Sequence, residues 1–198
     1  MVSVQIDSTT GSELVSTSEI KSYARIETSS DDTLIGILNT AARTSCEDYI
    51  NRDIVAKTRT YFRSHVPEKG GNYVGLYADR YKIVLPYAPI NAITSVQTQE
   101  SDGSLKTASF DSYGFDDKYI ILTGLPNDDI KIVYTTTGMT DSALKLAILQ
   151  LATTYYDNRT DYVAGNITEI PSSVKKNIRP FQIYKWYLKW ILVNLEIE

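Results

Sequence analysis

The sequence predicts an α+β fold with a mainly helical core, a small antiparallel β insertion and a C-terminal arm. Apolar residues recur at helical spacing over 17–51 and again over 141–158. Between them, residues 54–136 contain β-branched and aromatic runs separated by turn residues, which is typical of short antiparallel strands. We therefore expect one domain over residues 1–181 and an aromatic arm over 182–198.

The first part of the core is predicted to consist of two helices. Ser16 and Glu19 have the spacing of a capping box, which predicts a short helix near 17–26. A second helix is expected after Ser30, with Asp31 and Asp32 in its first turn, where carboxylates favour the helix dipole. Its apolar stripe consists of Leu34, Ile35, Leu38, Ala41, Ala42, Tyr49 and Ile50.

The middle of the chain is predicted to form the β insertion. The clearest strand candidates are residues 58–62, 81–85, 93–98 and 130–134. Residues 96–99 and 105–108 flank Asp102-Gly103 as the two strands of a hairpin do. The stretch 64–79 contains paired glycines and mixed charges, so we expect a long exposed loop there.

A third long helix is predicted over 141–158, capped by Thr140 or Asp141. A polar link over 160–169 leads to a short helix around 174–178, which ends at Pro180. The two helices within 17–51 and the helix 141–158 are expected to pack through their apolar stripes into one helical core. Its predicted buried residues are Leu34, Leu38, Ala42, Leu144, Ile148 and Leu151.

Composition and charge exclude several functional classes. The 198-residue chain has a net charge of -4 and a pI near 5.1, which disfavours nucleic-acid binding over its whole surface. The amino terminus lacks the basic start and apolar run of a signal peptide, so we expect synthesis in the cytoplasm. Fifteen tyrosines against four phenylalanines suit surfaces that are buried against a partner yet keep a polar end.

No residue set predicts catalysis, a metal site or a cofactor. Cys46 is the single cysteine, which excludes an intrachain disulfide, and its place beside an apolar stripe predicts a buried, inert thiol. His65 is the single histidine, and no motif places a nucleophile beside it. The pairs Asp31-Asp32, Asp116-Asp117 and Asp128-Asp129 fall at a helix start or in turns, where aspartate serves local hydrogen bonds. The sequence therefore predicts a protein that is not an enzyme.

The arm is the strongest candidate for a binding site. It holds both tryptophans of the chain, and on a helix its apolar residues would form two stripes with only a narrow polar face. Such a segment needs a partner, so we predict a protein–protein interface formed by Phe181, Tyr184, Lys185, Trp186, Tyr187, Lys189 and Trp190. The alternative is a nucleic-acid-binding module that stacks bases on the same basic, aromatic segment.

Several strings, in their order along the chain, resemble the head–tail connector (adaptor) proteins of long-tailed phages. The similarity covers about 16–181. The strings are Ser18-Glu19-Ile20-Lys21-Ser22-Tyr23 followed by Asp31-Asp32 and Leu34-Ile35, then Leu85-Pro86-Tyr87-Ala88-Pro89-Ile90 running into Ile93-Thr94-Ser95-Val96. They continue with Val133-Tyr134-Thr135-Thr136-Thr137-Gly138, Tyr155-Tyr156-Asp157-Asn158-Arg159, Ile170-Pro171-Ser172-Ser173-Val174 and Ile178-Arg179-Pro180-Phe181.

The resemblance implies a structural protein of the virion neck without a cofactor. It implies a ring of twelve copies beneath the portal protein, joined on its other side to a stopper or tail-completion protein. DNA would pass through the channel without specific binding, and no membrane would be involved. The arm would then face the portal or an adjacent subunit.

A third hypothesis for the function, after the connector and the nucleic-acid-binding module, is a hydrolase that uses His65.

Overall fold

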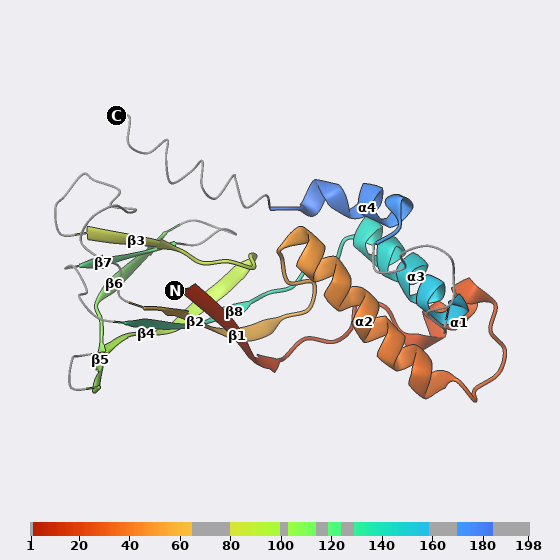
Figure 1. Cartoon of the computed structure of the whole chain (residues 1–198), viewed down its shortest axis with the longest axis horizontal. Coiled ribbons are helices and arrows are strands. Elements are labelled where there is room, and N and C mark those ends of the chain that lie inside the picture. Colours follow the sequence, from red (N-terminus) through yellow and green to blue (C-terminus); the bar gives the residue numbers. More distant parts are fainter. Residues whose placement is uncertain are drawn as a thin grey trace. The chain divides into compact units, whose positions relative to one another are not determined.

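The computed structural model describes residues 2–64, 80–99, 103–113, 119–123, 129–158 and 170–183. The chain folds into two compact units. A sheet unit holds the residues up to Gly11 together with Val55–Gly138, and a helical unit holds Ser12–Ile54 and Met139–Gln182. In Figure 1 the strands belong to the first unit and the helices to the second.

The larger sheet of the sheet unit has five antiparallel strands in the order β1-β2-β8-β4-β5. These strands are β1 (Val2–Thr9), β2 (Lys57–Arg63), β8 (Ile130–Thr136), β4 (Ile90–Gln99) and β5 (Leu105–Thr107). The register places Tyr61 of β2 opposite Val4 of β1 and Ile132 of β8. Because side chains alternate between the two faces, these three residues share one face of the sheet.

A second sheet contributes to the core of this unit. It has three strands, β3 (Arg80–Val84), β7 (Tyr119–Thr123) and β6 (Phe110–Tyr113), in the order β3-β7-β6. The core includes residues of both sheets and of the segment that follows β3. Its buried members are Tyr61, Ile83, Leu85, Ile90, Val96, Ile130, Ile132 and Tyr134. The Tyr134 hydroxyl donates a 2.9 Å hydrogen bond to the Pro86 carbonyl, so this buried ring leaves no unsatisfied donor.

The helical unit contains α1 (Thr17–Ala24), α2 (Asp32–Ile50), α3 (Ser142–Asp157), α4 (Ser172–Ile178) and the 3-10 turn η1 (Arg179–Phe181). The predicted capping box is confirmed: the Ser16 side chain accepts from the Glu19 amide, and the Glu19 carboxylate accepts from the Ser16 amide. Asp141 caps α3 by accepting from the Ala143 amide at 2.7 Å. The first helix and the third therefore begin where the sequence predicted.

The helical unit has its own hydrophobic core, formed by the long helices and the segments beside them. Ala42, Leu144, Ile148 and Leu151 are buried as predicted. Leu34 and Leu38 are only half-buried, so their predicted burial is wrong. The buried apolar members are Val15, Ile20, Ile35, Ala42, Cys46, Ile50, Ile54, Leu144, Ala147, Ile148, Leu151, Ala152, Val174 and Ile178.

The prediction of a mainly helical core with a small β insertion is wrong. The five-stranded sheet and its three-stranded companion bury a separate core that is not continuous with the helical one. The sequence predicts the strands as short separate runs, but their assembly from distant segments gives the chain a full β unit in addition to a helical unit. The structure is therefore α+β with both classes in comparable proportion.

Several predicted segments lie outside the described residues. These are the loop 64–79 except Ser64, the link 160–169, Asp116-Asp117, Asp128 and the arm from Tyr184 onward. None of the helices described is both long enough and apolar enough to span a bilayer.

Candidate functional site

The predicted interface is described at its first residue alone. Phe181 belongs to η1, is half-buried and packs against the core of the helical unit. Gln182, which follows it, donates a 2.9 Å hydrogen bond to the carbonyl of Tyr49 at the end of α2. The residues that begin the arm are thus attached to the helical unit. The other predicted interface residues, Tyr184, Lys185, Trp186, Tyr187, Lys189 and Trp190, lie outside the described residues.

The sheet unit presents a second candidate surface, the face of the five-stranded sheet that points away from its core. Phe62 on β2 lies opposite Lys131 on β8 in the register, and Gln97 on β4 lies on the other side of Lys131. These three residues share a face because they occupy paired positions on adjacent strands. All three are exposed or half-buried, in contrast to Tyr61 and Ile132 on the opposite face.

A hollow of about 320 Å³ lies at one end of this sheet. Phe62, Leu105 and Ile130 are its apolar members, and the first two are 37% and 52% exposed. The Lys131 ammonium lies 5.9 Å from the centre of the Phe62 ring, within range of a cation–π contact. The remaining lining residues are Arg63, Ser64, Gln99, Gly103 and Asp129. The hollow is thus partly apolar and is bordered by the charged side chains of Arg63, Asp129 and Lys131.

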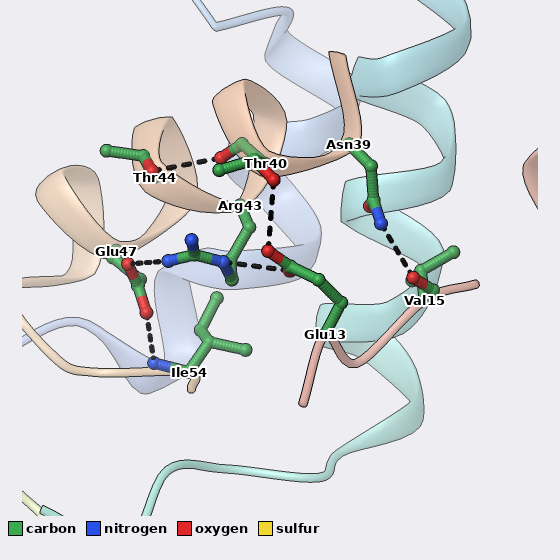
Figure 2. A network of polar contacts seen from close by, with 8 residues as sticks. All are labelled: Glu13, Val15, Asn39, Thr40, Arg43, Thr44, Glu47 and Ile54. Atoms are coloured by element: carbon green, nitrogen blue, oxygen red, sulfur yellow. Dashed lines mark hydrogen bonds and ion pairs between the residues drawn. The ribbon is translucent and has the colours of Figure 1, made fainter. Parts of the chain in front are cut away.

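A buried polar network stabilises the helical unit around α2, as Figure 2 shows. Arg43 lies between two carboxylates: its Nη1 donates to Glu47 Oε2 at 2.6 Å and its Nε donates to Glu13 Oε2 at 2.9 Å. The side chains of Arg43 and Glu47 are 7% and 3% exposed. A buried charge is tolerated only where a partner compensates it, and here each charge has one.

The same network attaches α2 to the segments before and after it. Glu13 Oε1 accepts from the Thr40 hydroxyl at 3.1 Å, and Glu47 Oε1 accepts from the Ile54 amide at 2.8 Å. Asn39 Nδ2 donates a 2.7 Å hydrogen bond to the Val15 carbonyl (Figure 2). The network therefore fixes the positions at which the chain enters and leaves this helix.

Within the described part of the chain, Cys46, Tyr61 and Glu19 have shifted pKa values, and each shift has a structural cause. Burial raises the pKa of the Cys46 thiol to about 12, which confirms the prediction of a buried, inert cysteine. Burial also raises the pKa of the Tyr61 hydroxyl. The Lys145 ammonium and the hydrogen bonds from Ser16 lower the pKa of Glu19 to about 2. None of the three adjoins a nucleophile–base pair among the described residues, so these shifts reflect packing and capping.

Of the three predicted acidic pairs, Asp31-Asp32 is described in full, and both of its carboxylates make structural contacts. Asp31 precedes α2 without a side-chain capping bond and accepts from the Tyr156 hydroxyl at 2.6 Å. Asp32 accepts from the Lys21 ammonium at 2.7 Å. Within the ranges that the structure covers, no group of three metal-ligating side chains comes together.

Sequence reasoning missed both the hollow and the polar network. The hollow depends on register, because Phe62, Lys131 and Leu105 lie far apart in the chain and meet only through strand pairing. The network had a visible signal: Arg43 and Glu47 are four residues apart on one helix, the spacing of a helical ion pair.

Among the described residues, the main exposed features are the outer face of the five-stranded sheet and the hollow at its end. The family model for head completion proteins matches residues 13–169. The chain belongs to the head completion protein family, and the resemblance to virion connector proteins is thereby confirmed. No curated protein matches the chain in sequence.

Solved structures with the same fold come from gene transfer agent (GTA) particles. A chain of the native GTA virion matches with a TM-score of 0.66 at 15% identity, covering 92% of this chain and 96% of that one. A chain of the native GTA neck, computed with C12 symmetry, has a TM-score of 0.64 at 16% identity over 93% and 96% of the two chains. A chain of the empty-particle neck, computed with C6 symmetry, has a TM-score of 0.62 at 16% identity over 92% and 96%. The fold thus extends over both units.

Proposed function

We propose that this protein is a structural head–tail connector that forms a ring in the neck of a tailed phage or a phage-like particle. The observation that carries the proposal is the family match over residues 13–169, to which the shared fold of GTA neck chains adds support. Twelve copies per ring fit the C12 symmetry of the native GTA neck. The ring would lie beneath the portal protein, join it to a stopper or tail-completion protein, and leave a channel for DNA.

The proposed mechanism is recognition and mechanical coupling, without bond chemistry. The net charge of -4 favours this role, because a mildly acidic ring does not retain DNA that passes through it. The hollow on the sheet offers a docking point for a partner side chain, and no described cluster offers a metal or a nucleophile–base pair.

The arm is proposed as the contact with the portal. Trp186 and Trp190 are the residue type that most often dominates a protein interface, with losses of about 2 kcal/mol or more on truncation. Phe181 and Gln182 are attached to the helical unit, so the arm starts from a fixed position there. The lysines at 185 and 189 would lie at the rim of that interface.

Reconstitution on portal-bearing heads that lack a connector tests the proposal. The full chain is expected to bind these heads and to appear as a ring in electron microscopy. A chain that ends at Ile183 keeps the Gln182 bond to Tyr49 and is expected to stay folded but not to bind.

Matched substitutions within the arm distinguish the loss of a specific contact from a loss of folding. Trp186→Ala with Trp190→Ala is expected to weaken binding, whereas Lys185→Ala with Lys189→Ala, at the rim, is expected to have a smaller effect. Heads that bind the truncated chain with normal affinity would refute the arm as the anchor. The connector function would be refuted if the full-length chain did not bind portal-bearing heads but was retained on DNA in a salt-dependent way.

A further inference from the structure

The amino-terminal strand β1 forms an open edge of the five-stranded sheet. Seven of its eight residues are exposed, and Val4 alone is half-buried. Its outer side has no neighbouring strand in the described part of the chain, because the sheet order begins with β1. An edge strand carries a row of backbone donors and acceptors that can pair with another strand.

Unlike most edge strands, β1 carries little protection against such pairing. Soluble proteins usually protect an edge with lysine, proline or a very short strand. The strand Val2–Thr9 contains neither lysine nor proline, and it exposes Val2 by 55% and Ile6 by 50%. Its one register shift lies between Ile6 and Ser8, near one end of the strand.

The opposite edge of the same sheet is also open among the residues that the structure describes. There, strand β5 pairs with β4 alone, and its three residues are all exposed, with Leu105 exposed by 52%. Asp7 is the single charged residue of β1 and Lys106 is the single charged residue of β5. By the same measure β5 is the better protected edge, because it is short and carries Lys106, but both edges expose apolar side chains.

We propose that β1 of one copy pairs with β5 of the next, so that the five-stranded sheets of neighbouring copies join edge to edge around the ring. This inference rests on the proposed ring. A contact between two different edges is head-to-tail and can be repeated until a ring closes, whereas β1 pairing with β1 would stop at a dimer. The short β5 makes each contact weak, so a ring held by many such contacts forms cooperatively.

Cysteine cross-linking within assembled particles tests this pairing. Gln5 and Thr107 lie on the same sheet face, opposite Thr60 and Gln97 respectively, and both are exposed. A chain with Gln5→Cys and Thr107→Cys is incorporated into particles and oxidised. Variants that use Ser3→Cys in place of Gln5→Cys, or Leu105→Cys in place of Thr107→Cys, test the other registers in the same way. At least one combination is expected to give a ladder of linked copies on a non-reducing gel. Cys46 is buried with a raised pKa, so it adds no background.

The controls distinguish the possible contacts. Gln5→Cys with Ser95→Cys places the second thiol on the same exposed face but on the inner strand β4, and it is expected to give no ladder. Gln5→Lys with Ile6→Lys is expected to abolish ring formation, whereas Ile37→Lys, at the most exposed apolar side chain of α2, is expected to leave it intact.

Two results would overturn the pairing. The first is the absence of a ladder from every combination in particles that contain the normal number of copies. The second is a dimer formed by Gln5→Cys alone, which would show β1 paired with itself. Particles that never incorporate the wild-type chain would instead refute the proposed ring, and this inference with it.

Discussion

The Tyr156 hydroxyl donates a 2.6 Å hydrogen bond to Asp31 Oδ2, which joins the last turn of α3 to the residue that precedes α2. Asp31 was expected to serve the start of its own helix. It makes no side-chain capping bond. Its carboxylate instead accepts from a residue 125 positions later in the chain, and so connects the start of α2 with the end of α3. This contact is part of what holds the helical unit together.

Replacing Tyr156 with phenylalanine should remove this bond without leaving a cavity. The Asp31 carboxylate then loses a partly buried donor, so the free energy of unfolding should fall by about 1.5 kcal/mol. Urea unfolding followed by circular dichroism measures the change. Tyr23→Phe, at an exposed position on α1, is the matched control and should stay within about 0.5 kcal/mol of wild type.

Replacing Arg43 with methionine should destabilise the helical unit strongly. Glu47 would keep the Ile54 amide as a donor but lose the Arg43 guanidinium, and removing one member of a buried ion pair typically costs about 3–5 kcal/mol. Denaturant titration measures the loss. A double variant, Arg43→Met with Glu47→Leu, should recover part of it, and no recovery would contradict the role of the Arg43–Glu47 pair. Lys21→Met breaks the exposed pair with Asp32 and should cost about 1 kcal/mol or less.

Glu19 should make the stability of the helical unit depend on acidic pH. Its pKa falls from 4.5 to about 2 in the folded chain, so its contribution is fully present above pH 4.5 and is lost as the pH falls towards 2. Glu19→Gln should reduce this pH dependence between those limits. Urea midpoints measured at neutral pH and at several points between pH 4.5 and 2 test it. A variant with an unchanged acid profile would exclude Glu19 as its source.

Core truncations should follow burial in the structure. Ile148 is 1% exposed, so Ile148→Ala should lower the free energy of unfolding by about 2–5 kcal/mol. Leu38 is half-buried, and Leu38→Ala should cost clearly less. Thermal unfolding of the two variants gives the order. Equal losses would contradict the orientation of α2 described above.

The thiol of Cys46 should react only when the helical unit opens. Its side chain is buried and its pKa is about 12, so little thiolate is present at pH 8. An aromatic disulfide reagent should label the folded chain slowly and the denatured chain at once. Rapid labelling of the native protein would show that this part of the core opens readily.

The orientation of α2 could be predicted only in part from apolar residues. Hydrophobic periodicity correctly included Ile35, Ala42 and Ile50, but it also favoured Leu34, Leu38 and Ala41. The buried face instead continues through the polar residues Asn39, Arg43 and Glu47. The helix is rotated because Arg43 and Glu47 pair with each other, and because Glu47 and Asn39 Nδ2 bond to the adjoining backbone inside the unit. Such mutual compensation depends on tertiary contacts that a count of apolar positions does not contain.

The strands were predictable individually, but the sheet was not. The runs at 58–62, 93–98 and 130–134 were recognised, and the hairpin around Gly103 is confirmed as β4 paired with β5. The strand Val2–Thr9 was not predicted, although its apolar residues Val2, Val4 and Ile6 alternate with polar ones as they do in a strand. Strand order is set by long-range pairing, which local propensity does not encode.

The position of β8 has a consequence for how the chain folds during synthesis. It is the last strand of the larger sheet to be made, yet it lies in the middle, between β2 and β4. Until Ile130–Thr136 leaves the ribosome, the β1–β2 and β4–β5 pairs have no strand to connect them, and Tyr61 and Val96 lack their neighbour Ile132. Nascent chains halted before β8 therefore expose two unjoined half-sheets, the kind of intermediate on which chaperones act.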